Sequence, residues 1–179
     1  AVTGMGIDTL KTALDDLLRQ TPPRDDKGRP RLMVDRVFTV SGFGTIVTGT
    51  LIDGILMVGQ EVEILPSGLN SRIRGLQSHK QKVEQASPGS RVAINLTNIS
   101  TDQIRRGDVV TTPDWLEPSQ LVDTRLRALP DISRPLKHNQ EIEIFTGSTE
   151  VAGHLRLLGM KEMLPGEEGW VQLRLEQRI

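Results

Sequence analysis

Histidine, cysteine and paired carboxylates carry most side-chain catalysis, and this sequence offers little of that chemistry. The chain has 179 residues, with no cysteine and three histidines. His79, His138 and His154 are far apart and lack metal-ligand spacing to one another. The sequence also has no G-x-x-x-x-G-K-[ST] phosphate loop. We therefore expect no catalytic residue, metal site or cofactor within this chain, and we interpret the histidines as structural.

Two arginines and an aspartate are more informative. In RLMVDRVFTV, residues 31–40, apolar side chains alternate from Leu32 onward, and Arg36 falls on the same strand parity. An arginine on an apolar face must be bulged out, paired with an acid such as Asp35, or reserved for a ligand. Arg91 opens the segment RVAINL directly after a turn. Taken alone, these residues leave open both paired structural charges and a ligand site.

The segment from 71 to 91 is locally basic, with five basic residues against the single acid Glu84. We expect it to be either a solvated hairpin or a surface that contacts phosphates. The overall net charge of -1 argues against a generic polyanion binder, and an aromatic content of 3% without tyrosine argues against base stacking. The basic residues of the segment are Arg72, Arg74, Lys80, Lys82 and Arg91.

Glycines mark a second unusual stretch, VFTVSGFGTIVTGTL, residues 37–51. Glycine within a strand usually marks a bulge, a bend or a close backbone approach, so Gly42, Gly44 and Gly49 either shape a barrel or line a ligand. Because SGFGT lacks a lysine and lies between predicted strands, it is not expected to hold phosphate. Residues 106–108 spell the cell-adhesion tripeptide Arg-Gly-Asp, which we interpret as a turn before a strand.

The elements that must position these residues are mostly strands. Residues 6–20, GIDTLKTALDDLLRQ, have leucines at helical spacing and predict a helix, and residues 21–30, TPPRDDKGRP, predict an exposed linker. The rest is strand-like with turn signals between segments, so the chain is predicted to be mainly β. The predicted strands are residues 31–40, 44–52, 61–65, 71–77, 91–96 and 108–112 and, after a break at 113–120, residues 121–129, 141–145, 151–159 and 169–177.

The last four predicted strands are too few to close a barrel, so we expect a truncated second β module. The helix poses a similar problem, because its apolar stripe needs a partner surface. We expect it to be the last helix of a missing domain, packed here against a barrel flank or a neighbouring molecule. No apolar run approaches the ~20 residues of a membrane helix, and the N-terminus lacks a secretory pattern.

Several stretches of sequence carry a family resemblance. DRVFTVSGFGTIVTGTLIDG, residues 35–54, resembles the opening of the second domain of translational GTPases related to elongation factor Tu. GSRVAINLTNISTDQIRRGDVV, residues 89–110, resembles the close of that barrel. Residues 29–51 and 145–159 are most similar to the SelB branch, the selenocysteine-specific elongation factors. The resemblance implies two consecutive β-barrel domains of the elongation factor Tu type.

The resemblance also implies domain boundaries. Residues 1–20 are similar to the end of a GTPase domain, with AVTGMGI, from Ala1, resembling the tail of its guanine loop. A linker at 21–30, a domain 2 barrel at 31–114 and an incomplete domain 3 barrel at 119–179 follow. The GTPase active site would lie outside this chain, so the fragment itself is not expected to be an enzyme. GTP and Mg²⁺ are expected only in the parent GTPase.

Within the family, the barrel region binds the tRNA that the factor delivers to the ribosome. The resemblance implies that Asp35, Arg36 and Arg91 form the pocket for the selenocysteyl group. It implies a cytoplasmic protein without a membrane partner, which also binds a messenger-RNA hairpin through modules absent here. The expected tRNA phosphate contacts are Arg72, Arg74, Lys80 and Lys82.

Two other functions stay open. The same barrels occur in other translational-type GTPases and in the GTPase subunit of sulfate-activating enzymes, where the second barrel acts as a protein-binding or regulatory module. A freestanding β protein without an RNA role is a third possibility, but it leaves the helix stripe and the incomplete second sheet unexplained.

Overall fold

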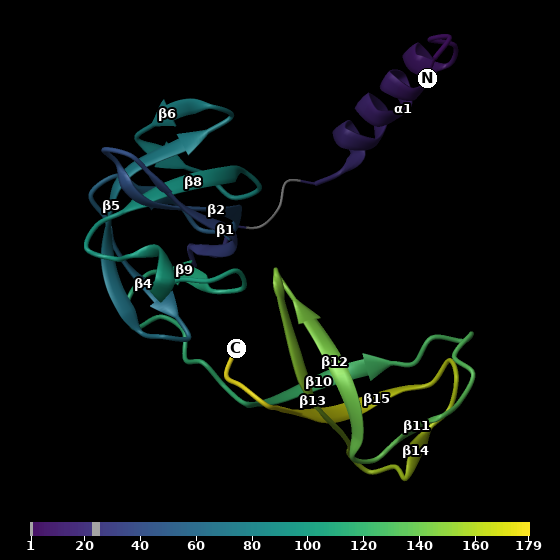
Figure 1. The fold of residues 1–179 in the computed structure, drawn as a ribbon. Helices are drawn as coiled ribbons and strands as arrows, with labels where there is room; N and C mark the ends of the chain where they lie inside the picture. The colour runs from purple at the N-terminus through teal and green to yellow at the C-terminus, as the bar shows by residue number, and fades with distance from the viewer. Residues whose placement is uncertain (1, 23–25) are drawn as a thin grey trace.

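The structure is a computed structural model that describes residues 2–22 and 26–179. The prediction of a mainly β chain is confirmed (Figure 1). A single α-helix, α1 (Ile7–Gln20), and one short 3-10 turn, η1 (Thr101–Gln103), are found among the described residues. The strands are β1 (Arg31–Val40), β2 (Gly44–Asp53), β3 (Leu56–Met57), β4 (Glu61–Leu65), β5 (Leu69–Ser78), β6 (Gln81–Val83), β7 (Gln85–Ala86), β8 (Arg91–Leu96), β9 (Val109–Thr111), β10 (Leu121–Arg127), β11 (Leu136–Lys137), β12 (Gln140–Thr146), β13 (Thr149–Leu157), β14 (Glu162–Met163) and β15 (Glu168–Leu175).

The first module, β1 to β9, is a closed antiparallel barrel. Its strand order is β4-β9-β1-β2-β8-β5-β6, and an additional pairing of β4 with β5 joins the two sides of the sheet. The alternating apolar residues that predicted these strands point inward, and residues such as Leu32, Val47 and Ile94 are fully buried. The β4–β5 pairing closes the ring of β4, β9, β1, β2, β8 and β5, while β6 extends from β5 as an additional outer strand.

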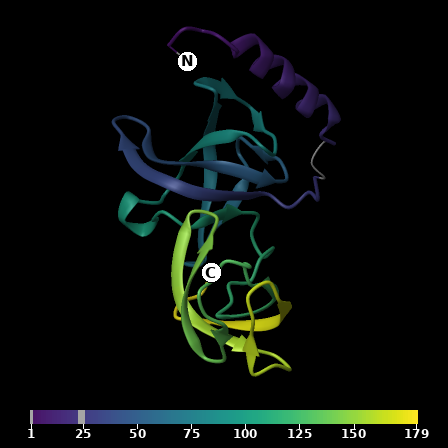
Figure 2. The same ribbon diagram turned by 90° about the vertical axis from the view of Figure 1, so that its right-hand side faces the viewer.

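The second module, the green and yellow part of the chain below the barrel in Figure 2, is an open sheet. Its strand order is β10-β15-β13-β12, and the β11–β14 pair accompanies it. All of its pairings are antiparallel, and its four main strands match the four predicted from the sequence. Its buried core is small and consists of Ala128, Leu155, Leu157, Met163 and Val171. Aromatic side chains remain exposed, with Phe145 at 70% and Trp170 at 61%. Within the described residues, β10 and β12 form the two edges of the sheet.

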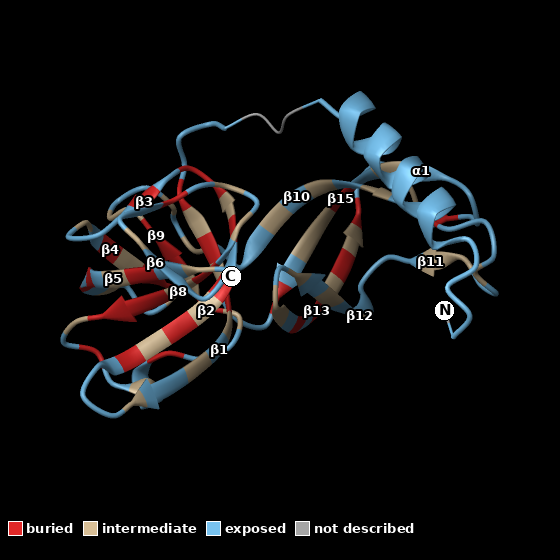
Figure 3. Cartoon of the chain, turned by 90° about the horizontal axis from the view of Figure 1, so that it is seen from above, coloured by how far each residue is buried: buried red, intermediate tan, exposed pale blue. Residues whose placement is uncertain are grey.

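Helix α1 forms where the leucine spacing predicted it, but the expected packing against a barrel flank is wrong. All fourteen of its residues are exposed, including Leu10, Leu14, Leu17 and Leu18, so the helix does not pack against a barrel flank (Figure 3). Its apolar stripe is therefore not covered by any of the described residues. No helix in the described part of the chain has the length and apolarity needed to span a membrane.

The linker residues from Asp26 to Pro30 are held by hydrogen bonds to the end of β2 and by burial of Pro30. Asp26 Oδ1 accepts the backbone N–H groups of Gly28 and Gly54, each at 2.9 Å, and Asp53 Oδ1 accepts that of Lys27 at 2.8 Å. Pro30 is buried. The sequence predicted an exposed linker at residues 21–30. The second half of this linker is instead hydrogen-bonded to the end of β2.

Candidate functional site

A β-bulge in β1 determines where the predicted site residues point. Val34 lies opposite Gly49 of β2 and Arg36 lies opposite Thr48, so Asp35 has no partner across the ladder. The extra residue of a bulge bends the strand and redirects side chains. Since antiparallel partners share a face of the sheet, Arg36 lies on the same outer face as Thr48.

The bulge corrects the strand parity predicted from the sequence. Simple alternation from Leu32 put Arg36 and Phe38 together on the apolar face. In the structure Val37 packs against the barrel core, whereas Arg36 and Phe38 are exposed. The bulge therefore accounts for the exposed position of Arg36.

The glycines of this region have structural roles in the barrel. A Cβ atom on Gly49 would lie 2.0 Å from the backbone oxygen of Met33, so only glycine allows β2 to approach β1 this closely. Gly42 and Gly44 have φ angles of +80° and +87° at the turn between β1 and β2, a conformation that glycine adopts without strain. The glycine-rich stretch thus shapes the barrel.

Asp35 and Arg91, which are 56 residues apart in the sequence, form a bidentate ion pair. Arg91 Nη1 lies 2.5 Å from Asp35 Oδ2, and Arg91 Nη2 lies 2.9 Å from Oδ1. Thr48 Oγ1 donates a further hydrogen bond to Asp35 Oδ1 at 2.7 Å. Burial raises the pKa of Asp35, but these hydrogen bonds and the positive charges of Arg91 and Arg36 outweigh it, so the pKa lies below its usual value. The carboxylate therefore stays ionised and holds Arg91 in place.

The strand register places a row of outward-facing residues beside this pair. Thr48 is opposite both Arg36 of β1 and Ala93 of β8, Ala93 is opposite Gln77 of β5, and Gln77 is opposite Lys82 of β6. The row runs across five adjacent strands on the outer face. At about 4.8 Å per strand, it spans roughly 19 Å along the sheet. It consists of Arg36, Thr48, Ala93, Gln77 and Lys82.

The predicted basic segment divides into two parts. Lys82 ends the row just described, and Lys80 lies beside it in the β5–β6 turn with a φ angle of +64°. Arg72 is about 16 Å from Gln77 along β5, and it pairs with Glu61 at 2.8 Å. Arg74 donates a hydrogen bond to the Phe43 carbonyl oxygen at 3.2 Å. The four residues are therefore not one patch, and only the two lysines lie at the Arg91 end of the barrel.

Two residues of this face were missed from the sequence, namely Thr48 and Gln77. Both are ordinary polar residues within strands, and only the register shows that they lie beside the charged ones. Ala1, predicted to be a remnant of a guanine loop, lies outside the described residues.

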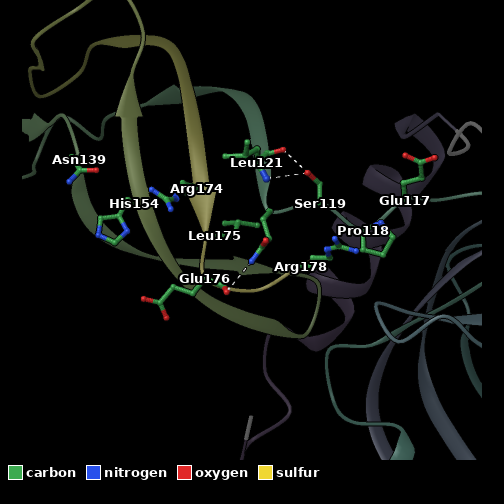
Figure 4. A pocket seen from close by; sticks show the side chains of 11 residues that line it. Glu117, Pro118, Ser119, Leu121, Asn139, His154, Arg174, Leu175, Glu176 and Arg178 are labelled. Carbon is green, nitrogen blue, oxygen red and sulfur yellow. Dashed lines mark hydrogen bonds between the residues drawn. The ribbon is translucent and has the colours of Figure 1, made fainter.

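A hollow on the second module has a more mixed lining (Figure 4). His154 and Arg174 are opposite each other on β13 and β15, and acidic side chains lie at its rim. Within the described residues, no group of three histidine, aspartate or glutamate side chains could hold a metal ion. Charges of both signs offset one another here, so the Asp35–Arg91 face is the better candidate site. The lining residues are Glu117, Pro118, Ser119, Gln120, Leu121, Asn139, His154, Arg174, Leu175, Glu176 and Arg178.

Comparisons with known proteins show what the chain as a whole is similar to. Residues 44–111 match the family model of elongation factor Tu domain 2. The chain is 40% identical over 179 residues to a selenocysteine-specific elongation factor from Desulfomicrobium baculatum, which covers 100% of this chain and 28% of that protein. It is also 40% identical over 106 residues to elongation factor 1-alpha from Pyrobaculum islandicum, covering 59% of this chain and 23% of that protein. The crystal structure of a bacterial selenocysteine-specific elongation factor matches 99% of this chain and 28% of its own, with a TM-score of 0.84 and 29% identity.

The closed barrel, the family model and these relatives together point to a class: the chain resembles translation elongation factors of the elongation factor Tu type, and its residues 44–111 match domain 2 of that family. The match to elongation factor 1-alpha covers little more than half of the chain. Within the class, the chain resembles the selenocysteine-specific elongation factors along its whole length. It spans 28% of the length of those relatives.

Proposed function

We propose that this chain is the tRNA-binding barrel region of a GTP-dependent elongation factor that delivers selenocysteyl-tRNA to the ribosome. In this proposal residues 31–114 form domain 2, residues 119–179 form part of domain 3, and residues 1–20 close the preceding GTPase domain. The observation that carries the proposal is the Asp35–Arg91 pair with Arg36 beside it, in a chain whose whole length is similar to selenocysteine-specific factors.

The charge of the site suits an anionic aminoacyl group. Asp35, Arg36 and Arg91 together leave one net positive charge on the outer face of the barrel. A selenol is far more acidic than a hydroxyl or a thiol, so a selenocysteine side chain is largely an anion at neutral pH. Guanidinium groups are always charged and weakly hydrated, and they bind partly desolvated anions well. The site therefore favours selenocysteine over serine.

Asp35 prepares Arg91 for such a ligand. A guanidinium has five N–H donors, and Asp35 accepts two hydrogen bonds from Arg91. The remaining donors are available because the Arg91 side chain is 57% exposed. The ion pair orients the fork of donors before the ligand arrives, which lowers the entropy lost on binding.

Lys80 and Lys82 extend the positive charge from Arg91 toward the β5–β6 turn. Phosphates of the tRNA acceptor end are the chemistry that these lysines would bind, because each neutralised phosphate releases counterions. Arg72 and Arg74 are less suited to this role, since Glu61 and the Phe43 carbonyl oxygen already engage them.

GTP and Mg²⁺ are assigned to the GTPase domain of the full-length protein rather than to residues of this chain. The glycine turn at 42–44 joins two strands, whereas a phosphate loop joins a strand to a helix, so the residues present here do not fit a nucleotide. The ribosome and a messenger-RNA hairpin are further proposed partners of the full-length protein, which we place in the cytoplasm.

The test compares two aminoacyl groups on one tRNA. The full-length protein with GTP is titrated with selenocysteyl-tRNA and with its seryl form, and affinity is read from protection of the ester bond against hydrolysis. We expect selenocysteyl-tRNA to bind at least about tenfold more tightly, which corresponds to about 1.4 kcal/mol. Equal affinity for both would favour a general translational barrel over a selenocysteine-specific one.

A further inference from the structure

The tip of the β12–β13 hairpin touches the first module next to the bulge of β1. Figures 1 and 2 both show this hairpin pointing from the second module toward the barrel. Ser148 Oγ donates a hydrogen bond to the backbone oxygen of Val34 at 2.6 Å. The same oxygen accepts the backbone N–H of Gly107 at 2.9 Å. A residue of the second module is thereby bonded to the residue that precedes Asp35.

The approach of the two modules at this point is close. Arg106 Nε donates to the Ser148 carbonyl oxygen at 3.2 Å, which fixes the hairpin tip from the other side. A Cβ atom on Gly107 would lie 1.7 Å from Thr149 Oγ1, so the contact requires glycine at position 107. The φ angle of Gly107, +99°, requires glycine as well. The turn at 106–107 is thus shaped to receive the hairpin.

Val34 connects this contact to the site. Its side chain is fully buried in the barrel core, and its backbone N–H donates to the Asp108 carbonyl oxygen at 2.8 Å. The register shift follows immediately, between Val34 and Arg36. A bulge has an unpaired residue and a broken ladder, so its direction depends on the anchored residues on either side. Ser148 supplies one of the few anchors on the Val34 side.

We propose that Ser148 is a positioning residue for the Asp35–Arg91 pair. Through its hydrogen bond to Val34, the second module fixes the conformation of the bulge in β1 and so the direction of the Asp35 side chain. While the Ser148–Val34 bond is made, Asp35 stays within reach of both Thr48 and Arg91. When the hairpin withdraws, the bulge loses an anchor and the pair loosens. Only the consequence for aminoacyl selectivity rests on the proposed function.

The geometric claim is tested on the 179-residue chain itself. The Asp35 carboxyl carbon is followed by NMR as a function of pH, and the Arg91 guanidinium N–H signals are followed at neutral pH. In Ser148→Ala we expect the pKa of Asp35 to rise toward its ordinary value and the Arg91 signals to broaden through faster rotation. Ser148→Thr keeps the hydroxyl and should restore both signals.

The matched control is Ser71→Ala. Ser71 Oγ also donates to a backbone carbonyl oxygen, that of Thr97 at 2.7 Å, but it lies on β5 far from the bulge. This variant should leave the Asp35 and Arg91 signals unchanged. An unchanged Asp35 titration and sharp Arg91 signals in folded Ser148→Ala would overturn the proposal, as would an equal effect of Ser71→Ala.

A second measurement separates this claim from the proposed function. In the full-length protein, Ser148→Ala should lower the preference for selenocysteyl-tRNA over seryl-tRNA by about three- to tenfold, as expected for loosening one hydrogen-bonded pair. If the NMR signals change and the preference does not, Ser148 still positions the pair, and it is the ligand assigned to the pair that is wrong. If the wild-type protein shows no preference at all, the proposed function fails independently of Ser148.

Discussion

Removing the Arg91 guanidinium is the most direct perturbation of the site. Arg91→Ala deletes both hydrogen bonds to Asp35 and lowers the net charge of the site from +1 to zero. Asp35 keeps its hydrogen bond from Thr48 and is partly exposed, so water solvates the unpaired carboxylate. The barrel itself should therefore remain folded, and the loss should concern the ligand.

The size of the loss follows from the bond that disappears. A charge-assisted hydrogen bond contributes about 1.5–3 kcal/mol, and about 1.4 kcal/mol changes an affinity tenfold. Arg91→Ala in the full-length protein should weaken selenocysteyl-tRNA binding by roughly ten- to a hundredfold. Seryl-tRNA offers no anion, so its affinity should fall much less. Arg36→Ala should act in the same direction, and the two changes should couple in a double-mutant cycle because they share one ligand.

Protection of the aminoacyl ester against hydrolysis measures both affinities in one assay. Arg72→Ala serves as the control, since it removes an arginine from an exposed ion pair elsewhere on the same barrel. The reasoning is refuted if both tRNAs weaken equally in Arg91→Ala, because the arginine would then serve the barrel or the acceptor end rather than the selenolate. Coupling near zero between Arg36 and Arg91 would also contradict a shared ligand.

Three further outcomes are expected. Gly107→Ala should destabilise the chain by about 1–3 kcal/mol in urea unfolding, because the φ angle of Gly107 and its contact with Thr149 both exclude a Cβ. In the control Gly75→Ala, the added Cβ would have no heavy atom within 4 Å, so stability should change by about 0.5 kcal/mol or less. Lys82→Gln should weaken the binding of all aminoacyl-tRNAs alike and lower the salt slope of binding by roughly one unit. Arg72→Gln should leave the salt slope unchanged, because Arg72 is paired with Glu61. An unchanged slope for Lys82→Gln would assign this lysine to a solvated surface. Burial raises the pKa of Asp108, so this carboxyl contributes stability that is present below its unfolded pKa of about 3.9 and is lost as the pH rises through its folded pKa. Asp108→Asn keeps an acceptor for the Arg105 N–H, and its stability relative to wild type should therefore increase between about pH 3 and pH 7. A stability difference that stays constant with pH would show that Asp108 does not titrate abnormally.

Local patterns predicted the elements well because the cause of each is local. Leucines at helical spacing predicted α1, and alternating apolar residues predicted every long strand of both modules. The very short strands β3, β6, β7, β11 and β14 were missed, since two or three residues carry too little periodicity to be recognised. The spacing of turn signals was also enough to predict two β modules.

Alternation failed from Asp35 onward, where the β-bulge of the candidate site places Arg36 and Phe38 on the outer face. A bulge depends on how two strands approach each other, and here β2 comes close to β1 at Gly49, the partner of the residue that precedes the bulge. Nothing within residues 31–40 shows this, so the face occupied by Phe38 could not be predicted correctly. The packing of α1 was unpredictable for a similar reason. The apolar stripe of the helix indicates that this face should be buried, but it does not indicate whether the covering surface belongs to the same chain.

The sequence by itself determined the class of the chain, its helix and long strands, and the three charged residues Asp35, Arg36 and Arg91 as candidates. The helix and strands follow from residue types and short-range spacing, which act through local sterics and solvation, whereas the class and the role expected for the three charged residues follow from the family resemblance. Only the tertiary structure decided that Asp35 and Arg91 meet, that Lys82 is aligned with Arg36 while Arg72 is not, and that Ser148 bonds to the strand beside them. Such contacts join residues up to 114 positions apart. They are set by barrel closure and strand register, which depend on the packing of the whole sheet rather than on any one segment.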